Sequence, residues 1–180
     1  MSGDILLFGR SVRDMAMAEI SQTVGTVLQD PERQILGSYV LNEVAFGLES
    51  LGLPRLEIIP RVDAALAQLG ILHLRDRETF GASGGEKQKI ALAGVLAMAP
   101  KILLLDEPSL GLSPLLVKEN FRVIQRLNQE GITIFLVEQN VRQTLAISTY
   151  VYVLSKGRVV AQGLAAELSQ DREVRQAYFG

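Results

Sequence analysis

The stretch Ile102-Leu103-Leu104-Leu105-Asp106-Glu107-Pro108 decides the fold class of this chain. Four apolar residues followed by two carboxylates are typical of a buried parallel strand, because such a strand is covered on both faces and presents its carboxyl end at the sheet edge. We expect Asp106 to hold Mg²⁺, directly or through water, and Glu107 to polarise a water that attacks a γ-phosphate. A strand followed by an acidic helix cap is the alternative interpretation of Asp-Glu-Pro alone.

A second motif lies upstream of this strand, in Ser83-Gly84-Gly85-Glu86-Lys87-Gln88. Ser83 and Glu86 form a capping box, and the two glycines let backbone N–H groups approach an anion at the positive end of the following helix. Taken alone, the motif predicts a plain helix start. An apolar helix from Lys89 to Met98 then leads to the strand, and this order of elements favours a phosphate site.

The segment from Ala82 to Lys89 resembles the signature loop of ABC-transporter ATPase subunits, and Ile102 to Glu107 resembles their Walker B strand and catalytic glutamate. The resemblance implies an α/β, P-loop-NTPase-like fold with three layers, a mostly parallel sheet and an inserted helical subdomain. It implies one truncated domain over residues 1–180, with residues 32–98 as the helical subdomain and residues 1–31 and 99–180 as the core sheet portion. ATP and Mg²⁺ are the implied cofactors, and the implied activity is ATP hydrolysis.

No Gly-Lys dipeptide occurs in the sequence, so the phosphate-binding loop G-x-x-x-x-G-K-[ST] is not among these 180 residues. The resemblance starts just after the point where the family's P-loop helix ends. We therefore expect the N-terminal P-loop unit to be missing, because the chain is naturally truncated, a fragment or engineered. That loop supplies most of the positive field that holds a triphosphate. Asp106 and Glu107 would repel the nucleotide, so we expect weak or absent ATP binding by the chain alone.

Three further residues match positions of the family's site. Gln29, directly after the expected strand Val24–Leu28, resembles the Q-loop glutamine, although Gln-Asp-Pro alone predicts only a strand-ending turn. Ser113 stands where the family usually has the D-loop aspartate, and Gln139 stands where it has a switch histidine. Glutamine can hydrogen-bond a γ-phosphate but cannot take up a proton near neutral pH. The resemblance thus implies catalytic roles for Glu107 and Gln139, metal contacts from Asp106 and Gln29, and nucleotide contacts from Ser83, Gly84, Gly85, Gln29 and Ser113.

The two halves of the chain resemble different subfamilies. Gln29 to Gly47 and Ile90 to Met98 are similar to energy-coupling-factor subunits that serve vitamin and metal-ion uptake. Glu138-Gln139-Asn140, Leu110 to Pro114 and the Tyr178-Phe179-Gly180 end are similar to subunits that energise branched-chain amino acid uptake. A natural or engineered mosaic with a junction near Ala99 to Ile102 accounts for both resemblances.

The resemblance also implies partners and a location. The partners are a second ATPase subunit, identical or not, and transmembrane permease subunits contacted through the segment Pro31–Leu53. The location is cytoplasmic and peripheral, on the inner face of the cell membrane. A truncated or mosaic module that folds or self-associates without binding ATP is the rival interpretation. Soluble ABC proteins of DNA repair or translation are a third, weaker interpretation, because their long coiled-coil insertions or tandem domains have no counterpart in these 180 residues.

The amino-acid composition limits the classes of protein and the kinds of site that this chain can represent. With 180 residues, 48% of them hydrophobic, and a net charge of −2, the chain is long enough to bury a core and is not built to bind nucleic acid. The absence of cysteine excludes disulfides and thiolate metal sites. The apolar run Ile90–Pro100 is too short to span a bilayer. The single histidine, His73, is expected to be structural and partly buried.

Hydrophobic periodicity and turn residues predict the remaining elements. The strands at residues 102–105 and 132–137 are apolar on both faces, and the neighbours that they require would have come from the missing segment, so we expect an unpaired edge that seeks another chain. The predicted strands are Ile5–Phe8, Val24–Leu28, Ile102–Leu105, Ile132–Val137 and a hairpin of Val151–Leu154 with Arg158–Ala161. The predicted helices are Pro60–Leu69, Lys89–Met98, one from Pro114 to Gly131, Val141–Ser148, Leu164–Leu168 and Arg172–Phe179.

Overall fold

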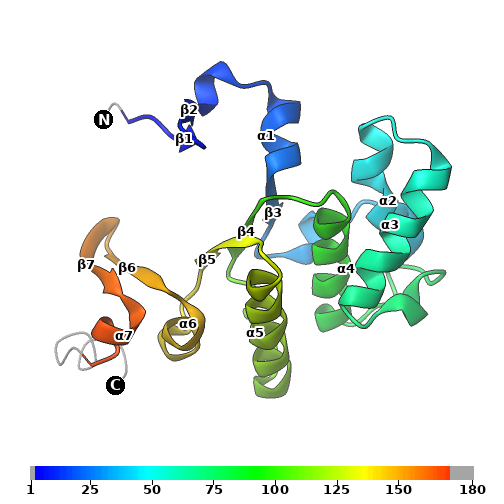
Figure 1. The fold of residues 1–180 in the computed structure, drawn as a ribbon. Helices are drawn as coiled ribbons and strands as arrows, with labels where there is room; N and C mark the ends of the chain where they lie inside the picture. The colour runs from blue at the N-terminus through cyan, green and yellow to red at the C-terminus, as the bar shows by residue number, and fades with distance from the viewer. Residues whose placement is uncertain (1–2, 171–180) are drawn as a thin grey trace.

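The computed structural model describes residues 3–170 (Figure 1). The predicted helix Arg172–Phe179 and the Tyr178-Phe179-Gly180 end lie outside these residues. In chain order the elements are β1 (Leu6–Leu7), β2 (Arg10–Ser11), η1 (Val12–Asp14), α1 (Met17–Thr23), β3 (Val24–Val27), η2 (Pro31–Arg33), α2 (Val40–Ser50), α3 (Arg55–Gln68), η3 (Leu72–Leu74), α4 (Gly84–Ala97), β4 (Ile102–Asp106), α5 (Pro114–Gln129), β5 (Thr133–Val137), α6 (Val141–Ile147), β6 (Tyr150–Ser155), β7 (Arg158–Leu164) and α7 (Ala165–Leu168).

A parallel three-stranded sheet forms the centre of the molecule, in the order β3-β4-β5. Helical segments connect these strands, as parallel pairing requires. The register pairs Val27 with Leu105 and Leu105 with Leu136, so the carboxyl ends of all three strands lie at one edge. This confirms the α/β class with a parallel sheet and places the residues that follow each strand next to one another.

One face of this sheet is packed against helices and the other is open. Leu103 and Leu105 are buried in a cluster that includes residues of α4 and α5. On β3, an added Cβ at Gly25 would lie 2.2 Å from Cγ1 of Val95 in α4, so the helix approaches the backbone closely. Within the described residues one face of β5 is uncovered, since Phe135 is 56% exposed, and this agrees with the expectation of an apolar strand that lacks a neighbour.

Helices α2, α3 and α4 pack together on one side of the sheet (Figure 1). Their shared core includes the fully buried Leu48, Val62 and Ile90. Helix α3 starts at Arg55, not at Pro60 as predicted, because Pro54 provides an extended residue before the helix and Pro60 is accommodated inside it. This packing accounts for a compact helical part, whereas the domain limits 32–98 stay a prediction.

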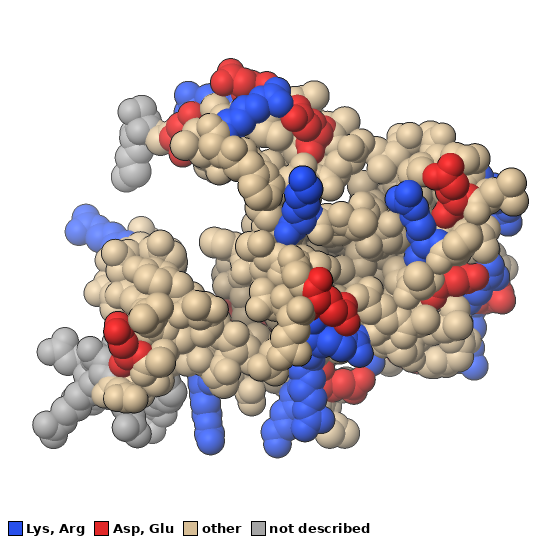
Figure 2. Space-filling view, in the orientation of Figure 1, with Lys and Arg blue, Asp and Glu red and all other residues tan. Residues whose placement is uncertain are grey.

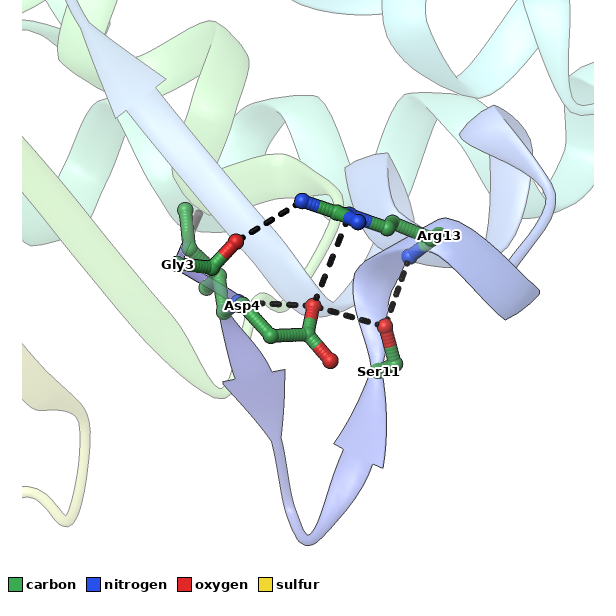
Figure 3. A network of polar contacts seen from close by, with 5 residues as sticks. Gly3, Asp4, Ser11 and Arg13 are labelled. Atoms are coloured by element: carbon green, nitrogen blue, oxygen red, sulfur yellow. Dashed lines mark hydrogen bonds and ion pairs between the residues drawn. The ribbon is translucent and has the colours of Figure 1, made fainter. Parts of the chain in front are cut away.

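The N-terminal segment forms a small hairpin where the sequence predicts one strand. Phe8 and Gly9 both have positive φ, which makes the two-residue turn between β1 and β2. Figure 3 shows how polar contacts close it: Oδ1 of Asp4 accepts from the Ser11 hydroxyl at 2.8 Å, and Arg13 donates to the Gly3 carbonyl at 2.7 Å. These groups are exposed, so each contact contributes little to stability.

The remaining elements follow the sequence closely. Strands β6 and β7 form the predicted hairpin, with its turn at Lys156 and Gly157. Expectation and structure differ at His73, which is exposed, because η3 turns Leu74 into the core and leaves the histidine outside. Within residues 3–170, the structure contains no helix of sufficient length and apolarity to cross a membrane.

Candidate functional site

Three predicted site residues meet at the carboxyl edge of the sheet. Gln29 and Glu107 each follow the Val27–Leu105 pair by two residues, and Gln139 follows β5. Nε2 of Gln29 donates to Oε2 of Glu107 at 2.8 Å, and Nε2 of Gln139 donates to Oε1 at 2.7 Å. The Glu107 carboxylate is therefore held between the loops that follow the two outer strands of the sheet. We refer to this arrangement as the carboxylate clamp.

Glu107 has a backbone conformation that is unusual for a residue with a side chain. Its φ is +44°, in the left-handed region, which is strained for residues other than glycine. The Glu107 N–H donates to the Val137 carbonyl at 2.8 Å, and this bond ties the strained residue to the end of β5. Backbone strain of this kind persists only where the surroundings hold it, and it is concentrated at functional sites.

Glu138 also organises this edge, although it was not among the predicted site residues. Its Oε1 accepts from the Ser109 N–H at 2.9 Å. Its Oε2 accepts from the backbone N–H groups of Gln139 and Asn140 at 3.1 and 3.2 Å. One carboxylate thus joins the loop after β4 to the loop after β5. The sequence signal that could have indicated this role is the position of Glu138 between the end of β5 and Gln139.

The signature motif begins α4, with Ser83 as the N-cap. The Glu86 carboxylate accepts from both the Ser83 N–H and the Ser83 hydroxyl, each at 2.7 Å, and so completes the predicted capping box. The hydrogen bond from the Ser83 hydroxyl, followed by that from its backbone N–H, lowers the pKa of Glu86 from its ordinary value. Glu86 therefore stays ionised and bonded to Ser83.

The two signature glycines have different surroundings. Around Gly84 nothing lies within 4 Å of an added Cβ, whereas at Gly85 a Cβ would lie 3.1 Å from Cδ1 of Leu116 in α5. Among the described residues, no backbone hydrogen bond is made by the N–H of either glycine. Gly84 consequently leaves free space and free donors for an anion, while Gly85 also permits close packing of α4 on α5.

Ser113 is not brought into the carboxylate clamp. Its hydroxyl accepts from the Leu116 N–H at 3.5 Å and caps α5, with Pro114 as the first helical residue. Ser83 likewise makes no contact with Glu107 among the residues described. The structure thus separates the predicted residues into the carboxylate clamp, the start of α4 and the start of α5.

The residues at the sheet edge fit a magnesium ion only as a partial set of ligands. Asp106, the last residue of β4, is half-buried, and its carboxylate has no hydrogen-bond partner among residues 3–170. Gln29 gives its amide nitrogen to Glu107 and keeps its oxygen available. No group of three or more His, Cys, Asp or Glu side chains within residues 3–170 is arranged as a metal site. Two oxygen ligands from the protein suit Mg²⁺, because this ion keeps several bound water molecules and takes its remaining ligands from phosphate groups.

Charges around these loops are mixed in sign. On the face drawn in Figure 2, basic and acidic side chains lie next to one another in several places, surrounded by uncharged residues. Lys87, four residues after Ser83, pairs with Glu32 at 2.6 Å and so joins α4 to η2. Neither the carboxylate clamp nor the start of α4 therefore has a strong positive field of its own.

Comparison with known proteins identifies the family. Residues 1–110 match the model of the family described as ABC transporter. A putative ABC transporter ATP-binding protein of Saccharolobus solfataricus is 38% identical over 99% of this chain and 33% of its own length. The energy-coupling factor transporter ATP-binding protein EcfA of Methanoculleus marisnigri is 39% identical over 93% of this chain and 61% of its own length. The chain thus spans between one third and three fifths of these relatives.

A solved structure agrees with this assignment. The cbiO1 protein of Clostridium perfringens, described as part of the ABC transporter complex cbiONQ, superposes with a TM-score of 0.87 at 37% identity. The match covers 98% of this chain and 71% of that protein. Because the family model covers 110 of the 180 residues and relatives of the same kind match nearly the whole chain, the chain belongs to the ABC transporter family, as part of an ATP-binding domain.

Proposed function

We propose that this chain serves in an ATP-binding and ATP-hydrolysing subunit of an ABC importer. The observation that carries the proposal is the carboxylate clamp, in which Gln29 and Gln139 hold Glu107 at the carboxyl edge of a parallel sheet. Parallel α/β sheets bind ligands at this edge. A carboxylate with one oxygen turned towards each flanking loop can accept a proton from a water placed between them.

The proposed roles follow from these positions. Glu107 is the general base, and Gln139 orients the γ-phosphate or the attacking water without exchanging a proton. Asp106 and the Gln29 oxygen would hold Mg²⁺, which when bound offsets phosphate charge. Ser83, Gly84 and Gly85 would bind the γ-phosphate of an ATP carried by a second subunit, and Ser113 would contribute from the start of α5.

The two halves of an ATP site would then come from different subunits. This chain has no Gly-Lys dipeptide, and therefore no phosphate-binding lysine loop within its 180 residues. Its own carboxylate clamp is acidic, so we infer that the chain alone holds ATP weakly or not at all. The start of α4, which has open space at Gly84, is the part that can still act on a nucleotide bound elsewhere.

An importer role rests on the relatives. Those similar over most of this chain include energy-coupling factor subunits, which favours uptake of a vitamin or metal ion over uptake of an amino acid. Permease subunits would dock on Pro31–Leu53, where Leu36 is 74% and Phe46 54% exposed. The proposed location of the chain is therefore cytoplasmic and peripheral, on the inner face of a membrane, through its partners. The branched-chain resemblance of the back half and a mosaic origin remain proposals.

A non-catalytic module is the second candidate, and one observation favours it. The outward face of β5 is exposed at Phe135 and Val137, so this strand can pair with or pack on another chain without any nucleotide. Such a module would self-associate and hydrolyse nothing.

An experiment that mixes this chain with a second ATP-binding subunit distinguishes the two candidate functions. The partner is an intact energy-coupling factor ATP-binding subunit whose own signature serine has been replaced. If this chain supplies a working signature loop, adding it restores part of the MgATP turnover of that partner. A heterodimer that is demonstrated by light scattering but gives no recovered turnover would leave the non-catalytic module as the function.

A further inference from the structure

Gln88 stands out because its polar side chain is buried, whereas Lys87 and Lys89 on either side of it in α4 are partly exposed. It is 6% exposed, and its Nε2 donates to the carbonyl of Pro108, the residue directly after Glu107. A second amide, Nδ2 of Asn120 in α5, donates to the same carbonyl at 2.6 Å. Burying a side-chain amide costs free energy unless the amide makes its hydrogen bond. The bond to the Pro108 carbonyl therefore fixes the position of the Gln88 amide.

The peptide group that joins Pro108 to Ser109 is held from both ends. Gln88 and Asn120 bind its carbonyl oxygen, while its N–H, that of Ser109, donates to Glu138. These three side chains come from α4, α5 and the loop after β5. A planar peptide group that is fixed at both its oxygen and its nitrogen cannot rotate without breaking at least one of these bonds.

This fixed peptide group also restrains Glu107. The proline ring holds the φ of Pro108 at about −65°. Fixing the peptide group after Pro108 therefore also restricts the peptide group that joins Glu107 to Pro108. A residue that precedes proline is itself sterically limited, and Glu107 is additionally at φ +44°. The strained conformation that directs the Glu107 carboxylate to Gln29 and Gln139 therefore depends on contacts outside the carboxylate clamp.

We propose that Gln88 is a positioning residue for Glu107: by holding the Pro108 carbonyl, it couples the helix that begins at Ser83 to the strained backbone that places the carboxylate. The importance of this coupling for catalysis rests on the proposed function of Glu107. Movement of α4, whose first turn carries the signature loop, is transmitted to Glu107 through one side chain of the same helix. The coupling itself can be measured without nucleotide.

The test replaces Gln88 with methionine, which has similar volume and no strong donor, and follows the 180-residue chain by nitrogen–proton correlation spectra. We expect the side-chain amide signals of Gln29 and Gln139 to shift, although Gln88 contacts neither residue. We also expect exchange of the Glu107 and Leu110 amides to accelerate about five- to tenfold, since losing one hydrogen bond loosens their bonds to Val137 and Glu107.

Ile58→Val in α3 is the matched control, because Ile58 is buried and none of the hydrogen bonds to this peptide group comes from α3. It should leave the Gln29 and Gln139 signals in place. Asn120→Ala removes the second donor and should act in the same direction as Gln88→Met, and it carries the test if the methionine variant does not fold. Unchanged Gln29 and Gln139 signals in Gln88→Met, or equal shifts in Ile58→Val, would overturn the proposal. Neither result bears on whether mixing restores ATP turnover.

Discussion

Replacing Glu43 with glutamine should destabilise the protein by about 1–3 kcal/mol, because a buried carboxylate holds the loop before α2. Oε2 of Glu43 accepts from the N–H groups of Leu36 and Gly37 at 2.8 and 2.7 Å. Hydrogen bonds to charged groups contribute about 1.5–3 kcal/mol each, and glutamine keeps an acceptor oxygen but no charge. Water can reach this loop at the exposed Leu36, which places the expected loss below the sum of two full bonds.

The effect should extend to the segment before the signature loop. The Gly37 carbonyl accepts from the Thr79 hydroxyl at 2.7 Å, and the Thr79 N–H donates to Ser38 at 3.0 Å. Urea unfolding gives the free energy, and hydrogen exchange at Thr79 reports the local loosening. Glu49→Gln, at an exposed position of the same helix, is the control and should change stability by less than about 0.5 kcal/mol. Equal unfolding midpoints for the two variants would refute the reasoning.

Three further outcomes are expected. Gly25→Ala should cost about 1–3 kcal/mol in urea unfolding, because its Cβ would lie 2.2 Å from Val95; an unchanged midpoint would contradict the packing of α4 on β3. The pKa of Glu86 is lowered in the fold, so its contribution is complete above the unfolded value near 4.5 and is lost as pH falls below it. Glu86→Gln should flatten this acid dependence of stability, and identical pH profiles would count against the capping box. Millimolar MgATP should leave the melting temperature of the chain alone unchanged, whereas a concentration-dependent rise would show real binding.

Strand β4 and the start of α4 could be predicted from the sequence, because the residues that specify them are close together in the chain. The apolar run before Asp106 and the capping box at Ser83 each fix an element through its own residues, and both were confirmed as structure. The start of α3 was misplaced because Pro60 reads as a helix start, whereas packing of Ile58 and Val62 lets the helix continue through it. Tertiary burial outweighed the local proline signal there.

The contacts around Glu107 could be predicted only in part. Gln29 and Gln139 were selected by position, and the structure brings both to Glu107. Glu138 and Gln88 were missed as site residues, because their partners are backbone groups of distant loops that no sequence pattern specifies. The uncovered face of β5 was expected, because the strand is apolar on both faces and its expected neighbour, the P-loop unit, is not among these 180 residues.

The central claim is that Ser83 acts on an ATP held by another subunit, and one comparison of variants tests it most directly. Ser83→Arg and Ser21→Arg of this chain are each mixed with the signature-disabled partner, and MgATP turnover is measured after heterodimers have been confirmed. Ser21 is exposed on α1, away from the carboxylate clamp and the start of α4, so its arginine variant should restore turnover as the unmodified chain does. Ser83→Arg places a bulky side chain where the phosphate would bind and should abolish the recovery, since loss of one well-placed donor typically costs about 10²–10³ in rate. Equal turnover with the two variants would contradict the account.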